Sequence, residues 1–121
     1  MNERAWLARL RGKYVEYATL YFGGALPIIP IVLSYRMRKK VAEVETTGGK
    51  PTNLVVSARH IQTHGWKAAQ ETLLHEMLHV AQAARGLPMH HDRYFRGEAQ
   101  RLGINASAKE YIKPLKRCHL K

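Results

Sequence analysis

His75-Glu76-Met77-Leu78-His79 places two histidines four residues apart with a glutamate between them. On an α-helix, residues four apart lie on one face, about one turn from each other, so both imidazoles can bind one small cation. Glu76 projects about 100° away around the helix axis and can border the ion without binding it. The motif therefore predicts His75 and His79 as metal ligands and Glu76 as the base that deprotonates a water on the metal.

The residues around this motif predict a helix over 66–85. Gly86 and Pro88 follow Arg85 and are typical of a helix end. Four apolar side chains recur at helical spacing along it: Leu74, Met77, Leu78 and Ala81. We interpret this stripe as core packing. Burying two histidines and a glutamate along with the apolar face of a helix is costly unless their polar groups find partners. A bound cation provides one.

A catalytic zinc site needs a third protein ligand, and the chain offers His90 and His91. A second helix is predicted over 91–102, with Gly103 as its stop. Neighbours on a helix point about 100° apart, so both histidines cannot easily face the ion. The apolar residues of this helix are spaced to share a stripe with His91: Tyr94, Phe95 and Leu102. We therefore predict His91 as the third ligand, with His90 in solvent or behind a ligand as its hydrogen-bond partner.

The chain is strongly basic, with 20 Lys and Arg against 9 Asp and Glu and a formal net charge of +11. This imbalance favours an anionic partner, and nucleic acid is the commonest polyanion. No base-reading motif is present, so we expect contacts to backbone phosphates. The candidate residues lie in two groups, one internal and one in a basic C-terminal tail from about residue 109: Arg36, Arg38, Lys39 and Lys40, then Lys113, Lys116 and Arg117.

The remaining sequence predicts a small α+β fold formed by one domain over 1–121. A helix capped by Asn2 is expected to run to about residue 20, and strands are expected at 28–36, 40–46 and 53–57. Pro30 marks the first of these as an edge strand or a bulge. We interpret 47–51 as a turn and 60–65 as an exposed loop carrying His60 and His64. No secretory signal or membrane span is evident, which predicts a cytoplasmic protein without a membrane partner. We expect it to be nucleoid-associated, or nuclear if the host has a nucleus. We also expect a monomer.

The run 72–79, then Gly86, then His91-x-x-x-Phe95, resembles the SprT-like zinc metallopeptidases. Upstream, Ser34-x-Arg36-Met37 and Asn53–Ser57 resemble the segments that lead into the family's active-site helix. The resemblance implies a zincin-like fold and one Zn²⁺. It also implies hydrolysis of peptide bonds in proteins bound to, or crosslinked on, DNA. Many bacterial members carry a four-cysteine zinc ribbon, whereas Cys118 is the sole cysteine in this sequence, so we expect a minimal form without the ribbon.

Two other functions remain compatible with the sequence. The first is a non-catalytic nucleic-acid-binding module with a structural metal. An intact Glu76 argues against it, because a closed structural site has no use for a general base. The second is a hydrolase that acts on bonds other than peptide bonds.

Overall fold

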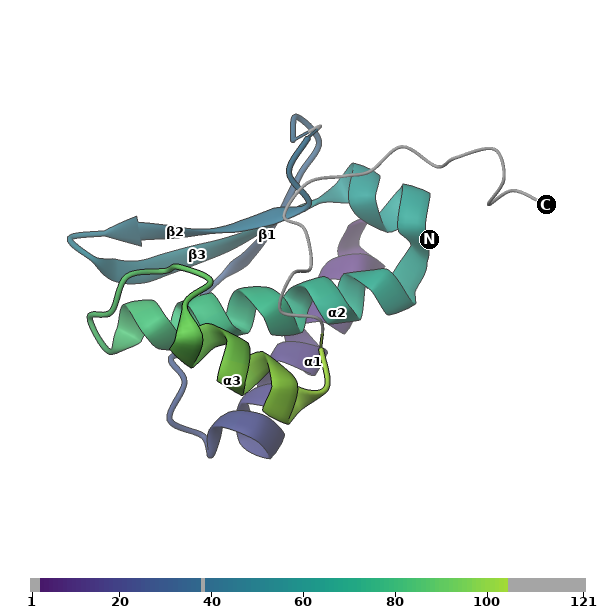
Figure 1. Cartoon of the computed structure of the whole chain (residues 1–121). Coiled ribbons are helices and arrows are strands. Elements are labelled where there is room, and N and C mark those ends of the chain that lie inside the picture. The colour runs from purple at the N-terminus through teal and green to yellow at the C-terminus, as the bar shows by residue number, and fades with distance from the viewer. Residues whose placement is uncertain (1–2, 38, 105–121) are drawn as a thin grey trace.

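A long central helix, α2, lies between a small sheet and the last helix (Figure 1). The computed structural model describes residues 3–37 and 39–104. Its elements in chain order are α1 (Glu3–Phe22), β1 (Ile31–Ser34), β2 (Ala42–Thr47), β3 (Lys50–Ser57), α2 (Ala58–Ala84) and α3 (Arg93–Leu102). The predicted α+β fold is confirmed: an N-terminal helix, three strands, a long helix that carries His75 and His79, and a last helix that follows His91.

The sheet is mixed, with strand order β1-β3-β2. β1 runs parallel to β3, with Ile31 opposite Leu54, and β2 runs antiparallel to β3. β1 and β2 are therefore the edge strands. The strand expected over 28–36 is shorter than predicted. It begins directly after Pro30, which has no N–H for the ladder and contributes only its carbonyl, accepting from Leu54 N at 2.9 Å.

The hairpin between β2 and β3 turns within two residues, Gly48 and Gly49. Both have positive φ, 58° and 81°, a combination that two-residue hairpins require and that glycine adopts at little cost. The turn expected over 47–51 is therefore shorter than predicted. β3 starts at Lys50, three residues before the predicted strand.

The interpretation of 60–65 as an exposed loop is wrong, because α2 begins at Ala58. Ser57 caps this helix: its Oγ accepts from His60 N at 3.2 Å and donates to Met37 O at 3.0 Å. An N-cap of this kind satisfies one of the unpaired amides of the first turn. The chain leaves helical geometry only at Gly65, with φ 87° and ψ 179°, and then resumes the helix that carries the motif.

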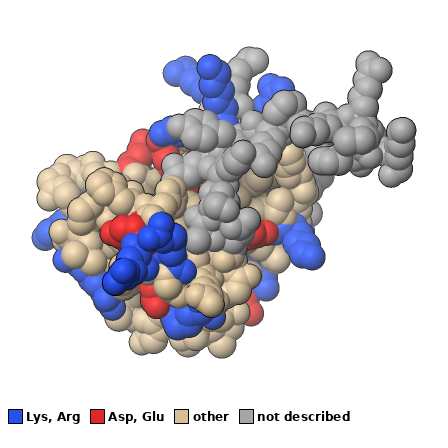
Figure 2. Space-filling view, in the orientation of Figure 1, with Lys and Arg blue, Asp and Glu red and all other residues tan. Residues whose placement is uncertain are grey.

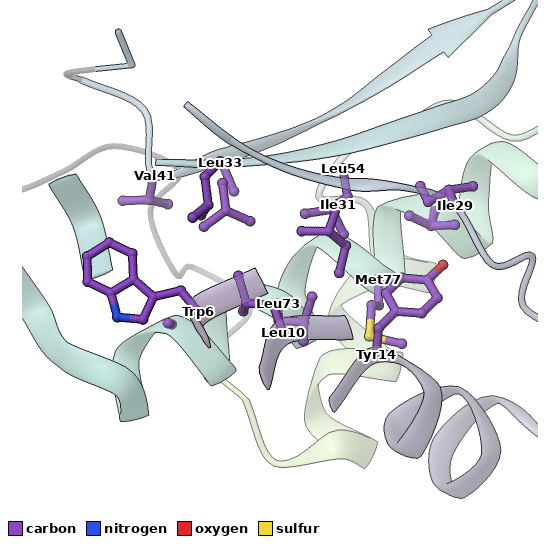
Figure 3. Close-up of a cluster of buried hydrophobic side chains, with 14 of the residues drawn as sticks. Trp6, Leu10, Tyr14, Ile29, Ile31, Leu33, Val41, Leu54, Leu73 and Met77 are labelled. Carbon is purple, nitrogen blue, oxygen red and sulfur yellow. The ribbon is translucent and has the colours of Figure 1, made fainter. Parts of the chain in front are cut away.

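The main core lies between the sheet, α1 and α2 (Figure 3). α1 buries residues at helical spacing, as its sequence predicts: Trp6, Leu10, Tyr14 and Ala18. From α2, Leu73 and Met77 point into the same core. On another side of α2, Leu78 packs against Phe95 and Ala99 of α3. Residues 73–83 are all buried, so the two motif histidines stand on a rigid, fully enclosed segment.

Several predictions fall on residues that the structure does not describe. These are the Asn2 cap, Arg38, and the basic tail with Lys113, Lys116 and Arg117. Within the described ranges, none of the helices has the length and apolar character needed to cross a bilayer.

Candidate metal centre

The structure brings the three predicted ligands together. His91 Nε2 lies 3.1 Å from His75 Nε2 and 3.3 Å from His79 Nε2. One ligand atom from each histidine lies within 4.8 Å of those of the other two. His75 and His79 are each 3 % exposed, whereas His91 is exposed. Two ligands thus come from the enclosed helix and the third comes from the surface.

These spacings suit a small divalent cation. With Zn–N bonds of about 2.0–2.1 Å and tetrahedral angles, two ligand nitrogens stand about 3.3 Å apart. The two observed separations, 3.1 and 3.3 Å, lie at or just below that value. A set of three imidazoles is typical of a catalytic zinc site, in which the fourth position stays open. The residues therefore fit the metal that the sequence predicts.

Phe95 forms the wall behind all three imidazoles. Its ring centroid lies 5.0 Å from that of His75, 4.7 Å from that of His79 and 4.8 Å from that of His91. Phe95 is fully buried, and its position on α3 is fixed by packing against Leu78. Because the ring has no polar atoms, it restricts how the imidazoles can turn without competing for the ion.

His91 lies just before α3, and not on its buried stripe as predicted. The choice of His91 over His90 is supported by the three-histidine group, but the reason given for it, helical periodicity, is wrong. Asp92 is the N-cap: its Oδ1 accepts from Phe95 N at 3.0 Å. This cap holds the backbone next to His91 in an extended conformation, with φ −83° and ψ −170° at Asp92.

Gln82 links a helix ligand to the loop that carries His91, and the sequence analysis missed it. Its Oε1 lies 2.8 Å from His79 Nδ1, and its Nε2 donates to His90 O at 2.8 Å. The amide is fully buried, with 0 % exposure. Since Oε1 is an acceptor, His79 Nδ1 carries the proton, so Nε2 is the ring nitrogen that bears the lone pair a cation requires. A polar amide three residues after a ligand, between buried Ala81 and Ala83, is the signal that identifies such a residue.

Replacing Gln82 with leucine is expected to weaken zinc binding about 10–100-fold, the usual effect of removing a hydrogen-bond partner behind a metal ligand. Leucine keeps most of the volume but neither orients His79 nor holds His90. Competition with a chromophoric chelator measures the affinity. Gln62→Leu, at an exposed position of the same helix, is the matched control. Equal affinities for the two variants would show that Gln82 has no such role.

Glu76 stands beside the three nitrogens without joining them. Its Oε2 lies 3.9 Å from His75 Nε2, and the residue is 2 % exposed. The group of atoms that lie within 4.8 Å of one another contains only the three histidines. Glu76 also borders two cavities, one lined by His75 and the other by His79. A carboxylate next to the ligands and facing open space is well placed to exchange a proton with a substrate or water.

His60, expected in an exposed loop, is instead 5 % exposed on α2. Its Nε2 lies 2.8 Å from Thr72 Oγ1, and its ring packs 5.2 Å from that of His64. Burial, with a smaller contribution from His64, lowers the pKa of His60 from 6.5 to about 4, against an opposing effect of the Ala68 carbonyl. His60 is therefore neutral near pH 7.

This pKa predicts acid sensitivity of the fold. The folded pKa lies below the unfolded one, so the stabilisation is fully present above pH 6.5 and is lost as the pH falls towards about 4. We expect the wild type to lose on the order of 2 kcal/mol more than His60→Gln over this window, after allowance for solvent screening. Denaturant unfolding in the presence of a chelator at each pH measures the difference. Parallel stability profiles for the two proteins would contradict the prediction.

Of the internal basic residues, Arg36 and Lys39 are exposed on the β1–β2 connection, and Lys40 is half-buried at its end. Figure 2 shows basic side chains at the top of the molecule, over this connection. Lys40 Nζ lies 3.5 Å from Glu43 Oε2, and both residues border a cavity together with Glu76 and His79. Positive charge therefore extends from the connection to the rim of the histidine site.

The comparisons agree with this geometry. The model of the SprT-like family matches residues 10–119, so the chain belongs to the SprT-like family. All three histidines and Glu76 fall within the matched range. No curated protein and no solved structure matched the chain.

Proposed function

We propose that this protein is a zinc-dependent peptidase that hydrolyses peptide bonds of proteins associated with, or crosslinked to, DNA. One observation carries the enzymatic part: the Nε2 atoms of three imidazoles converge, and a buried carboxylate that is not part of the group lies 3.9 Å from one of them. A purely structural site needs four protein ligands and no neighbouring base. Three ligands with an adjacent glutamate are the arrangement of zinc hydrolases.

Each residue of the site has a definable task. His75, His79 and His91 would hold the ion through Nε2, with the Gln82 amide fixing the His79 tautomer. Zinc, when bound, supplies a water of lowered pKa and polarises the scissile carbonyl. Glu76 accepts the proton of the attacking water on a carboxylate oxygen and returns it to the leaving amine nitrogen. Burial of Glu76 keeps competing water away from this exchange.

The edge strand β2 provides a place for the substrate backbone. β2 pairs with β3 on one side. A cavity of about 160 Å³ runs from β2 to the histidines and is bordered by Lys40, Glu43, Val44, Glu76, His79 and Met89. An extended peptide that adds to this edge forms main-chain hydrogen bonds and brings a carbonyl towards the site. Such pairing suits unfolded or extended segments of protein chains.

The association with DNA is supported by charge. The net charge of +11 favours a polyanion, and Arg36 and Lys39 lie on the connection that ends at Lys40, beside the cavity. A protein held on DNA next to this connection is thereby presented to the site. Phosphate contacts of this kind carry little sequence specificity and weaken steeply with salt.

The test uses zinc-loaded full-length protein and a DNA-binding substrate protein, either bound to duplex DNA or free. We expect zinc-dependent cleavage that is faster on DNA and slows as salt rises. The double variant Arg36→Gln/Lys39→Gln should lose the DNA effect, whereas Lys50→Gln, at the far end of the β2–β3 hairpin, should retain it. Stable zinc binding and DNA binding without cleavage would instead identify a non-catalytic nucleic-acid-binding module.

A further inference from the structure

A second cavity opens beside Glu76 and is lined by His75 but not by His79. It has a volume of about 130 Å³ and is bordered by residues of α2 and by Val41, which directly precedes β2: Val41, His60, Ala68, Glu71, Thr72, His75 and Glu76. This volume is close to the ~150 Å³ of an engineered apolar cavity that binds benzene. The cavity therefore accommodates one side chain of medium size, but not an indole.

The lining combines apolar walls with one buried polar group. Val41 and Ala68 present methyl groups, and His60 is 5 % exposed. His60 Nε2 is engaged by Thr72 Oγ1 at 2.8 Å. His60 Nδ1 is buried and lacks a hydrogen-bond partner of good geometry, although the Ala68 carbonyl approaches the ring closely enough to raise its pKa. A buried polar atom left unpaired is costly, and a ligand that supplies a partner removes that cost.

The identity of this partner follows from the Thr72 contact. The Thr72 hydroxyl either donates to His60 Nε2 or accepts from it, so Nδ1 is either a donor or an acceptor. A carboxamide carries both a C=O and an NH₂ group and satisfies either case. A carboxylate would be repelled by Glu71 and Glu76. An ammonium would be attracted by these two side chains but would lose its hydration against a lining that is mainly apolar. A neutral amide on a short apolar stem is therefore the best match.

We propose that this cavity is the side-chain specificity pocket of the peptidase, and that it selects glutamine, or a similarly sized neutral side chain with a hydrogen-bonding tip, next to the scissile bond. The proposal rests on the proposed function, because Glu76 borders both this pocket and the cavity along β2. A peptide extended along β2 and past Glu76 thus places one side chain in the pocket beside the bond that is hydrolysed.

Cleavage-site profiling on an unfolded protein tests the pocket first. Mass spectrometry of the products from the zinc-loaded wild type is expected to show glutamine enriched at one position adjacent to the cut. Matched peptides should then give about a 10-fold higher kcat/KM for glutamine than for leucine, the worth of one satisfied hydrogen bond, with glutamate, lysine and tryptophan poorer still. A uniform profile, or one that favours a charged residue at this position, would overturn the proposal.

Two variants separate the pocket from the metal site. Ala68→Leu fills the cavity and is expected to lower cleavage of the glutamine peptide with zinc content unchanged, whereas Ala84→Leu, an exposed alanine of the same helix, serves as the matched control. His60→Leu should shift the preference from glutamine to leucine. Equal kinetics of Ala68→Leu and Ala84→Leu would exclude a role for the cavity in substrate binding.

A readout that does not need catalysis distinguishes failure of the pocket from failure of the proposed function. In ¹⁵N-histidine-labelled protein, N-acetyl-glutamine N-methylamide is expected to shift the His60 ring resonances, identified by their loss in His60→Leu, whereas the leucine analogue leaves them in place. If the protein shows this shift but cleaves no substrate, the binding pocket is supported and the proposed peptidase function is refuted. Cleavage without the shift would refute the pocket alone.

Discussion

Glu76→Gln is expected to lower peptide hydrolysis by about 10²–10⁴-fold while zinc binding stays at the wild-type level. Glutamine has the shape of glutamate but cannot accept a proton at neutral pH, so only the proton transfer is removed. The position of Glu76, 3.9 Å from His75 Nε2 but outside the three-histidine group, predicts that it contributes to the reaction and not to metal affinity. Steady-state cleavage of a protein substrate and zinc quantification on the same preparation measure both properties.

The control for this variant is Glu16→Gln, an exposed carboxylate on α1 that pairs with Lys13. It should leave both cleavage and zinc content unchanged. Unchanged cleavage in a zinc-loaded Glu76→Gln variant would contradict the peptidase proposal and favour a structural role for the metal.

His91→Ala is expected to reduce zinc affinity by more than about 100-fold. This loss exceeds the effect of removing a residue, such as Gln82, that only hydrogen-bonds to a metal ligand. Only two imidazoles remain in this variant, whereas zinc enzymes hold the ion with three protein ligands. Zinc content after dialysis, followed by chelator competition, measures the loss.

His90→Ala is the matched control for His91→Ala because it removes the neighbouring imidazole. His90 contributes its main-chain carbonyl, which accepts from Gln82 Nε2 and survives the substitution. We expect His90→Ala to retain one equivalent of zinc. A His91→Ala protein that also retains a full equivalent would refute the three-histidine site.

The helix ligands were predictable because their arrangement is local. The spacing of His75 and His79 fixes their common face once the segment is helical, and the apolar stripe around them indicates that helix. His91 lies in the three-histidine group, as predicted, but the helical periodicity used to choose it does not apply, because α3 begins at Arg93, after the Asp92 cap. The reach of a loop residue into the site depends on tertiary packing, here against Phe95, which periodicity does not encode.

The contact of Gln82 with His79 is local and leaves a signal in the sequence, but its contact with the loop, and that of His60 with Thr72, join residues too far apart for local spacing to predict. The Gln82 amide meets the carbonyl of His90, beyond the end of α2. His60 meets Thr72 only because α2 continues past Gly65. The Ser57 cap was read as the end of a strand, and the first turns of α2 were consequently read as a loop.

The division of the three histidines between an enclosed helix and an exposed loop also has a kinetic consequence. His75 and His79 are buried on α2, whereas His91 is exposed. If the three histidines hold an ion, we expect it to detach from His91 first on leaving and to engage His91 last on arrival. Metal exchange would then depend on movement of the segment that carries His91, while His75 and His79 would fix the position of the ion.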